Sequence, residues 1–251
     1  MSDFHALTQK HAQWKDIFSS DDASSIVNQS IYLVYDFALF NLINESRKLH
    51  AADESDQLGM NGYVHHFIDR CFIERQVLSI RRLTDRTRSN SPRSICRLIS
   101  DIKSNTHLIT RENYFKLFEV EYDVEFLKQK ESDWLKANIP KDGKAFVIPS
   151  SVSAFQSSDL HKQFDMLSGA ESGSRSLRDT VSQSRLSRFL DELNQATDEV
   201  KNYADRYVAH ATKRELDKET GHYERGISID LLARAQHTVL KTVRFIGIHF
   251  I

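Results

Sequence analysis

The chain has 251 residues, within the range of one large domain or two small ones. With 40% hydrophobic and 27% charged residues, its composition is that of an ordinary soluble globular protein. The net charge of −1 excludes a general attraction to nucleic acid, so any such contact must come from a local patch. Only eight glycines and three prolines are present, and this scarcity of helix breakers favours an all-α fold over an all-β fold.

The cysteines and the apolar segments indicate a cytoplasmic protein. Cys71 and Cys96 fit neither a disulfide framework nor a thiolate zinc site, so a reducing compartment is expected. Residues 1–5 lack the basic start and apolar core of a signal peptide. The most apolar run, residues 31–43, is too short to span a bilayer, and we predict that it forms a buried central helix with no membrane contact.

Five helices are predicted in the first segment, residues 1–137, and in the first of them apolar residues recur at the spacings of three and four that mark an amphipathic helix. Pro92 is expected in the first turn of the fourth helix, where its missing N–H does no harm, and Thr110 is expected to cap the fifth. The third helix is expected to bury an apolar face made of Val64, Phe67, Cys71, Phe72 and Leu78. The five helices are expected at residues 4–18, 23–49, 63–84, from 91 onward, and 110–136.

Residues 138–173 differ in character from the segments on either side. They hold two of the three prolines, three glycines and a serine-rich run. We predict a long irregular excursion from the bundle, with one short helix after Asp159, because loops of this length usually serve a function or are disordered.

The last segment, residues 174–251, contains neither glycine nor proline up to residue 220. A final helix is expected to begin near Ser228. The predicted fold is therefore an all-α helical bundle whose core comes from the two helical segments. Within the last segment, apolar and small residues alternate spacings of four and three, as in a seam for antiparallel helix packing, at Leu186, Leu190, Leu193, Thr197, Val200, Ala204, Tyr207 and Ala211.

Arg206 and His210 are the candidate catalytic pair. Four residues apart on a helix, they would lie on one face, about one turn from each other. Arginine is a permanent cation, and histidine is the side chain best suited to moving a proton near neutral pH. The pair could therefore cleave or bind a phosphodiester. The alternative is a structural pair, in which His210 packs beside a tyrosine seam and Arg206 is a solvated charge.

Two stretches of this sequence resemble a known superfamily. The segment Tyr203-Ala204-Asp205-Arg206-Tyr207-Val208-Ala209-His210 resembles the terminal signature of the HEPN (higher eukaryotes and prokaryotes nucleotide-binding) superfamily, in its abortive-infection branch (Abi type U). Arg81-Arg82-Leu83-Thr84-Asp85, followed by Ser94-Ile95-Cys96-Arg97-Leu98-Ile99, resembles the Arg-Leu-x-Asp stretch and short Leu/Ile helix of the same branch. The resemblance covers roughly residues 25–130 and 176–245, and the family usually places more residues between its Arg and His than separate Arg206 from His210.

The resemblance implies a toxin of the toxin–antitoxin or phage-defence kind that cleaves RNA without a metal ion or cofactor. It implies Arg206 and His210 as catalytic residues, and a homodimer in which the two pairs meet across an interface that includes Tyr203 and Tyr207. A cognate antitoxin protein is a possible partner. Predicted RNA-binding residues are Arg81, Arg82, Asp205 and Tyr207. The alternative function is a non-catalytic helical module that binds nucleotide, RNA or a protein.

A local basic patch offers a second candidate contact for RNA, because arginine grips phosphates bidentately. The alternative is a solvated helix face with intramolecular ion pairs. Near it, His65, His66, Asp69 and Cys71 show some ligand spacing on a helix but lack an identifiable four-ligand motif, so no metal site is predicted. The patch comprises Arg70, Arg75, Arg81, Arg82, Arg86, Arg88, Arg93 and Arg97.

Overall fold

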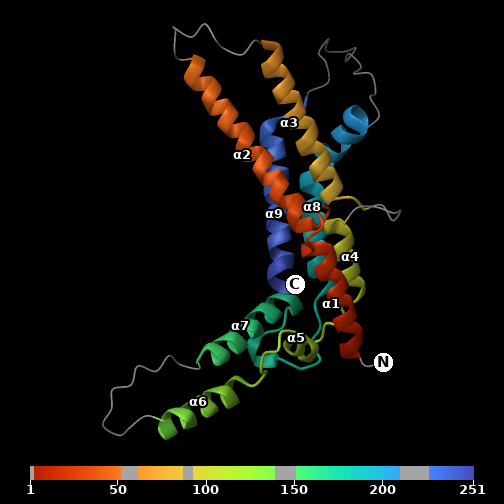
Figure 1. Ribbon diagram of the computed structural model, residues 1–251. Coiled ribbons are helices and arrows are strands. Elements are labelled where there is room, and N and C mark those ends of the chain that lie inside the picture. The colour runs from red at the N-terminus through yellow and green to blue at the C-terminus, as the bar shows by residue number, and fades with distance from the viewer. Residues whose placement is uncertain (1–2, 52–61, 87–92, 139–150, 210–225) are drawn as a thin grey trace. The chain divides into compact units, whose positions relative to one another are not determined.

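The computed structural model describes residues 3–51, 62–86, 93–138, 151–209 and 226–251 (Figure 1). Within these residues the chain is helical, without strands, and the predicted all-α fold is confirmed. The described helices are α1 (Asp3–Ser19), α2 (Ile26–Ala51), α3 (Gly62–Leu83), α4 (Ile95–Ser104), α5 (Arg111–Leu117), α6 (Val124–Asn138), α7 (Ser151–Ser168), the 3-10 turn η1 (Ser172–Ser174), α8 (Gln183–Tyr203), the π-helix η2 (Ala204–Ala209) and α9 (Ile229–Phe250).

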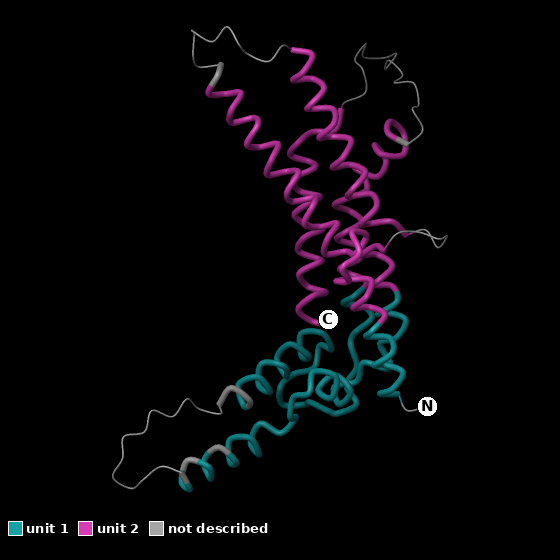
Figure 2. The backbone as a smooth tube through the Cα atoms, viewed as in Figure 1, with its two compact units in different colours: residues 1–12, 101–186 teal, residues 13–100, 187–251 magenta. Residues whose placement is uncertain are grey.

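The described chain forms two compact units (Figure 2). Unit 1 consists of residues 1–12 and 101–186, and unit 2 of residues 13–100 and 187–251. These boundaries differ from the three predicted segments, because the described part of the excursion belongs to unit 1 together with α5 and α6.

Unit 2 is a helical bundle in which α2, α3 and α9 pack against one another, and α3 also contacts η2. The rings of Phe40 on α2 and Phe72 on α3 stack with centroids 3.7 Å apart. Gln76 of α3 is buried and donates a hydrogen bond from Nε2 to the Leu33 carbonyl oxygen, 3.1 Å away. Since a buried amide is costly unless it is hydrogen-bonded, this contact fixes how α3 lies on α2. The last helix begins at Ile229, close to the predicted start, and Ser228 caps it by accepting a hydrogen bond from the Leu231 N–H at 3.1 Å.

Unit 1 is centred on the fully buried guanidinium of Arg111. Its Nη2 donates to Asp165 Oδ1 at 2.7 Å and to Asp179 Oδ2 at 3.0 Å, and its Nη1 lies 3.3 Å from His161 Nδ1. His161 Nε2 lies 3.0 Å from the Tyr122 carbonyl oxygen, which can only accept, so Nε2 carries the proton and Nδ1 accepts from Arg111. The buried cation is therefore matched by two carboxylates and a neutral imidazole, as a buried charge requires.

The predicted fifth helix, residues 110–136, is divided into α5 and α6. Thr110 caps α5 as expected, and its hydroxyl accepts from the Asn113 N–H at 3.2 Å. Glu119 then adopts a positive φ of 54°, a conformation that ends a helix. Asp123 opens α6 by accepting from the Phe126 N–H at 2.9 Å. The apolar spacing continues through residues 110–136 and therefore did not reveal that the helix ends near Glu119, where the backbone conformation changes.

The excursion predicted at residues 138–173 is more regular than expected. Instead of one short helix after Asp159, its described part holds the 18-residue helix α7, which begins at Ser151. Leu160, Phe164 and Leu167 are buried, so α7 contributes to the core of unit 1.

The second helix is less buried than predicted. Of the apolar run at residues 31–43, only Leu33 and Phe40 are buried, so the expectation of a buried central helix is wrong. By length and composition alone, Ile26–Leu49 would suffice to cross a bilayer. The third helix also differs from its predicted face, since Phe72 is buried but Phe67 and Leu78 are exposed.

We predict that stability falls as the pH drops below about 6.5, because buried histidines resist protonation. Burial lowers the pKa of His161 and of His249 below 6.5, so at mildly acidic pH the unfolded chain binds more protons than the folded chain. This contribution to the free energy of unfolding is present above pH 6.5. It is lost as the pH falls toward the lower pKa that each histidine has in the folded chain. His161→Gln, which retains a donor and an acceptor, should reduce the dependence of melting temperature on pH between 7.5 and 5.5. If the melting temperatures of the wild type and of His161→Gln changed equally with pH, the lowered pKa of His161 would not account for the loss of stability.

Candidate functional site

The predicted seam on α8 leads directly into the candidate site. Leu193, Thr197, Val200 and Ala204 are fully buried, as the spacing of four and three predicted. After Tyr203, however, the α-helix becomes the π-helix η2 (Ala204–Ala209), which contains Arg206. Short π-helical turns are rare and occur frequently at functional sites. The sequence pattern predicted a continuous α-helix here and did not reveal this change.

An ion pair ties η2 to the end of α3. The Arg81 Nε lies 2.6 Å from Asp205 Oδ1, and the two residues are 124 positions apart in the sequence. Both side chains were predicted to bind RNA, and the structure pairs them with each other. Each therefore neutralises the other's charge, and together they hold the Asp205-Arg206-Tyr207 segment against α3.

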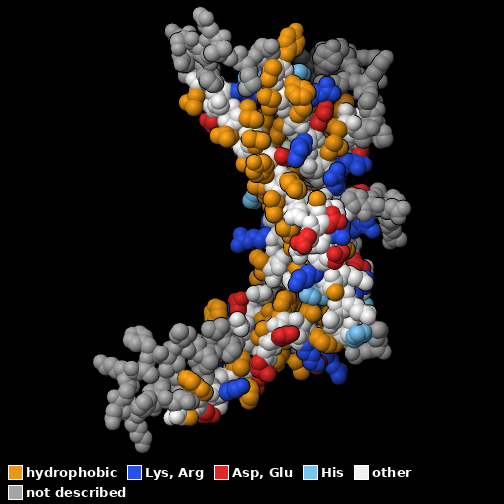
Figure 3. All heavy atoms as spheres, in the orientation of Figure 1, with side chains coloured by type: hydrophobic (Ala, Val, Ile, Leu, Met, Phe, Trp, Pro, Cys, Tyr) orange, Lys and Arg blue, Asp and Glu red, His pale blue; other side chains and the backbone are white. Residues whose placement is uncertain are grey.

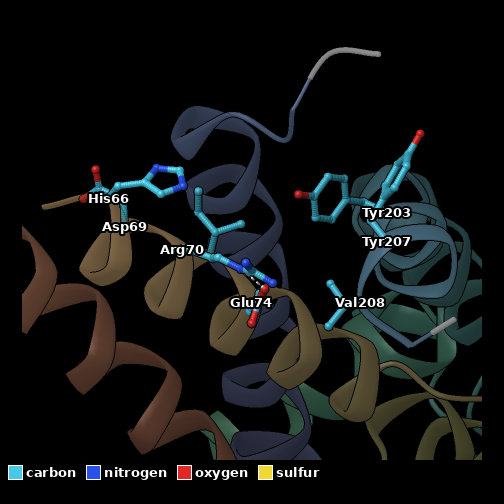
Figure 4. Close-up of a pocket in the computed structure, with 8 residues that line it drawn as sticks. His66, Asp69, Arg70, Glu74, Tyr203, Tyr207 and Val208 are labelled. Atoms are coloured by element: carbon cyan, nitrogen blue, oxygen red, sulfur yellow. Dashed lines mark hydrogen bonds and ion pairs between the residues drawn. The ribbon is translucent and has the colours of Figure 1, made fainter. Parts of the chain in front are cut away.

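A pocket with a volume of about 400 Å³ lies between α3 and the end of α8 with η2. Figure 4 shows the two tyrosines on one side and the side chains of α3 on the other. The rings of Tyr203 and Tyr207 are tilted, with centroids 5.1 Å apart. The pocket thus combines aromatic faces with polar groups, a combination suited to small organic ligands such as a nucleobase. It is lined by His66, Asp69, Arg70, Ile73, Glu74, Tyr203, Tyr207 and Val208.

Charges in the pocket are largely matched. Arg70 Nε donates to Glu74 Oε1 at 2.7 Å, and this hydrogen bond raises the pKa of Arg70. Asp69 Oδ1 accepts from Arg47 Nη1 at 2.6 Å. An anionic ligand would therefore bind Arg70 only by displacing Glu74 from it.

The arginine patch is similarly engaged. Arg75 pairs with Asp36, Arg81 with Asp205, and Arg93 with Asp16 at 3.0 Å. These contacts agree with the alternative of a helix face with intramolecular ion pairs. Arg82, Arg86 and Arg97 are exposed, and Arg88 lies outside the described residues.

The predicted catalytic pair is described only in part. Arg206 is exposed on η2, whereas His210 lies outside the described residues. Of the predicted RNA-binding residues, Tyr207 lines the pocket and Arg82 is exposed at the end of α3. The contribution of Glu74 and Ile73 to the same pocket was not predicted, because nothing in the sequence signals that this part of α3 faces Tyr203 and Tyr207.

The described residues contain no group of three or more His, Cys, Asp or Glu side chains arranged to hold a metal ion. The chain matches no protein-family model, no curated protein and no solved structure.

We predict a measurable coupling between Arg81 and Asp205. Both side chains are partly exposed, so a double-mutant cycle with Arg81→Ala and Asp205→Ala should give a coupling free energy of about 0.2–1 kcal/mol in thermal or urea unfolding. The matched control combines Arg81→Ala with Glu192→Ala, whose carboxylate pairs with Lys241 instead; these two effects should add. Additive effects in the Arg81/Asp205 cycle would show that the pair does not anchor η2.

Proposed function

We propose that this protein is a metal-independent endoribonuclease of the HEPN kind, acting on RNA through Arg206 and His210. The observation that supports this most is the π-helical turn that carries Arg206 beside a pocket lined by two tyrosines. His210 follows Ala209, the last residue of this turn, by one position. Cation, proton acceptor and aromatic surface thus come from one short segment.

The proposed reaction is an internal transesterification. Neutral His210 accepts the proton of a ribose 2′-OH as the 2′-oxygen attacks the adjacent phosphorus. The bond to the 5′-oxygen of the next nucleotide breaks, and this oxygen leaves with a proton from solvent. The products are a 2′,3′-cyclic phosphate and a 5′-hydroxyl end. Arg206 binds the non-bridging oxygens as negative charge builds up in the transition state.

The pocket supplies a place for the base. A nucleobase stacked on Tyr203 or Tyr207 would gain on the order of 1–3 kcal/mol, without a strong sequence preference. Arg70 is positioned on the opposite side, where it can exchange Glu74 for a phosphate.

The biological setting is proposed from the resemblance to the HEPN superfamily. We propose a cytoplasmic toxin of the abortive-infection type, which acts in phage defence as a homodimer and is held in check by a cognate antitoxin. The support is the resemblance of residues 203–210 and of Arg81 to Asp85 to that branch of the superfamily.

A second candidate function is a non-catalytic module that binds RNA or nucleotide through the same pocket. Two observations favour it. Fewer residues separate Arg206 from His210 than is usual in the family, and several patch arginines are already paired with carboxylates. The two functions differ in one outcome: cleavage of bound RNA.

We predict that His210→Ala and the double variant with Arg206→Ala are about equally inactive on total RNA in EDTA. Loss of the base leaves Arg206 with little transition state to stabilise, so the two losses should not add. Each role is worth roughly 10²–10⁴-fold in rate. Helicity and melting temperature should stay nearly unchanged. If His210 is instead a packing residue, His210→Ala should lower stability by about 1 kcal/mol or more, and any loss of activity should follow unfolding.

His237→Ala and Arg234→Ala are matched controls, because both side chains are exposed on α9 of the same unit. These variants should cleave RNA at the wild-type rate. Wild-type cleavage by a well-folded His210→Ala protein would exclude the catalytic assignment.

We predict that charge reversal in the patch flattens the salt dependence of RNA affinity. Arg82→Glu is the cleaner variant because Arg82 is exposed, whereas Arg81→Glu also places a carboxylate against Asp205. Losing one phosphate contact should reduce the slope of log K against log salt by about 1. Arg234→Glu on α9 serves as the control. If the slope of log K against log salt is unchanged in Arg82→Glu, Arg82 makes no phosphate contact and is a solvated surface residue.

A further inference from the structure

The outer face of α2 is an exposed hydrophobic surface within unit 2. Ile31, Tyr35 and Leu42 are 56%, 66% and 67% exposed, and Figure 3 shows hydrophobic side chains gathered over α2. Leu33 and Phe40, by contrast, point into the core. Single exposed hydrophobic residues are normal, but a continuous row along a helix marks an interaction surface.

The spacing of this outer row identifies the kind of partner. Its members alternate steps of three and four over three heptads, the pattern by which one helix packs along another. The row runs down the side of α2 opposite its buried face. It comprises Asn28, Ile31, Tyr35, Ala38, Leu42, Glu45 and Leu49.

A lipid bilayer is a poorer match for the same surface. Lipid chains impose no heptad spacing, and Asn41, Glu45 and Lys48 are exposed on α2, where each would be costly in hydrocarbon. In addition, α2 is tied to α3 by Arg47 and Asp69, whose Nη1 and Oδ1 atoms are 2.6 Å apart. Because α3 carries many charges, α2 cannot enter a bilayer without separating from it.

We propose that the outer face of α2 binds the α2 helix of a second copy of this chain, in antiparallel orientation about a twofold axis. One register makes the row self-complementary. It places Tyr35 opposite the small Ala38 of the partner helix, and Ile31 opposite Leu42, in both halves of the pair. The large Tyr35 then faces a small side chain, and Ile31 and Leu42 form an apolar pair on each side of it.

Charge selects the antiparallel orientation over the parallel one. In a parallel pair, Glu45 would meet its own copy across the interface, and two facing carboxylates repel each other. In the antiparallel register, Glu45 instead faces Asn28 of the partner helix. This interface takes the place of the one through Tyr203 and Tyr207 that the resemblance implies, because two separate twofold interfaces on one chain would link copies into assemblies larger than a dimer. It does not depend on RNA cleavage.

Sedimentation velocity of the wild-type chain at micromolar concentration tests the proposal. The wild type should sediment as a dimer, at twice the chain mass of 29.0 kDa. Leu42→Glu introduces one buried charge per copy, so the dissociation constant should rise by about 100-fold or more. The matched control is Phe155→Glu, which alters an equally exposed side chain on α7 and should remain dimeric. Circular dichroism confirms that each variant is folded.

Site-directed cross-linking fixes the register, in a Cys71→Ala background that removes the exposed native thiol. Oxidising a mixture of Ile31→Cys and Leu42→Cys proteins should give a disulfide-linked dimer. Leu42→Cys alone should cross-link poorly, because in this register the two copies of residue 42 lie eleven residues, about 16 Å, apart along the helices. Efficient cross-linking by Leu42→Cys alone would overturn the antiparallel register. A monomeric wild type, or a dimer unaffected by Leu42→Glu, would overturn the interface. A monomer that floats with phosphatidylcholine vesicles through Leu42 would assign the face to lipid instead.

Discussion

The candidate site depends on the contact between the end of α3 and the π-helical turn after α8. Asp205 reaches Arg81 across 124 residues of sequence, and without it the turn that carries Arg206 would be attached to α3 only by packing. The buried seam of α8 leads into this contact. Its last described buried residue is Ala204, whose small side chain allows the turn to lie close to its neighbours. One ion pair and one small side chain thus position the segment.

Pairing also changes what the basic residues can do. A free arginine patch would attract RNA over a distance, whereas arginines that already have carboxylate partners attract it only through exchange. Arg70 and Glu74 illustrate this at the pocket, and Arg81 and Asp205 at the turn. The pocket therefore places two aromatic rings near an arginine, and the RNA proposed as the substrate brings a base for the rings and a phosphate for the arginine.

Helix starts could be predicted from the sequence of this fold, whereas one helix break and the long-range contacts could not. Thr110 was identified as a cap, and the start of the last helix was placed near Ser228, because helix starts depend on a few adjacent residues. The break at Glu119 depends on a backbone conformation that the apolar spacing does not encode. The exposure of α2 was missed because hydrophobicity predicts burial without saying whether the same chain provides it. The pairing of Arg81 with Asp205 follows only from the tertiary fold.

The proposed function is cleavage of RNA, in which Arg206 and His210 promote attack of the ribose 2′-hydroxyl on the adjacent phosphate. The chemical ends of RNA incubated with the wild-type protein in EDTA test it most directly. We expect 2′,3′-cyclic phosphate and 5′-hydroxyl ends, because in the proposed reaction a neutral histidine removes the 2′ proton and no metal-bound water takes part. RNA that is bound but left intact, or cleaved to 3′-hydroxyl and 5′-phosphate ends, would contradict it.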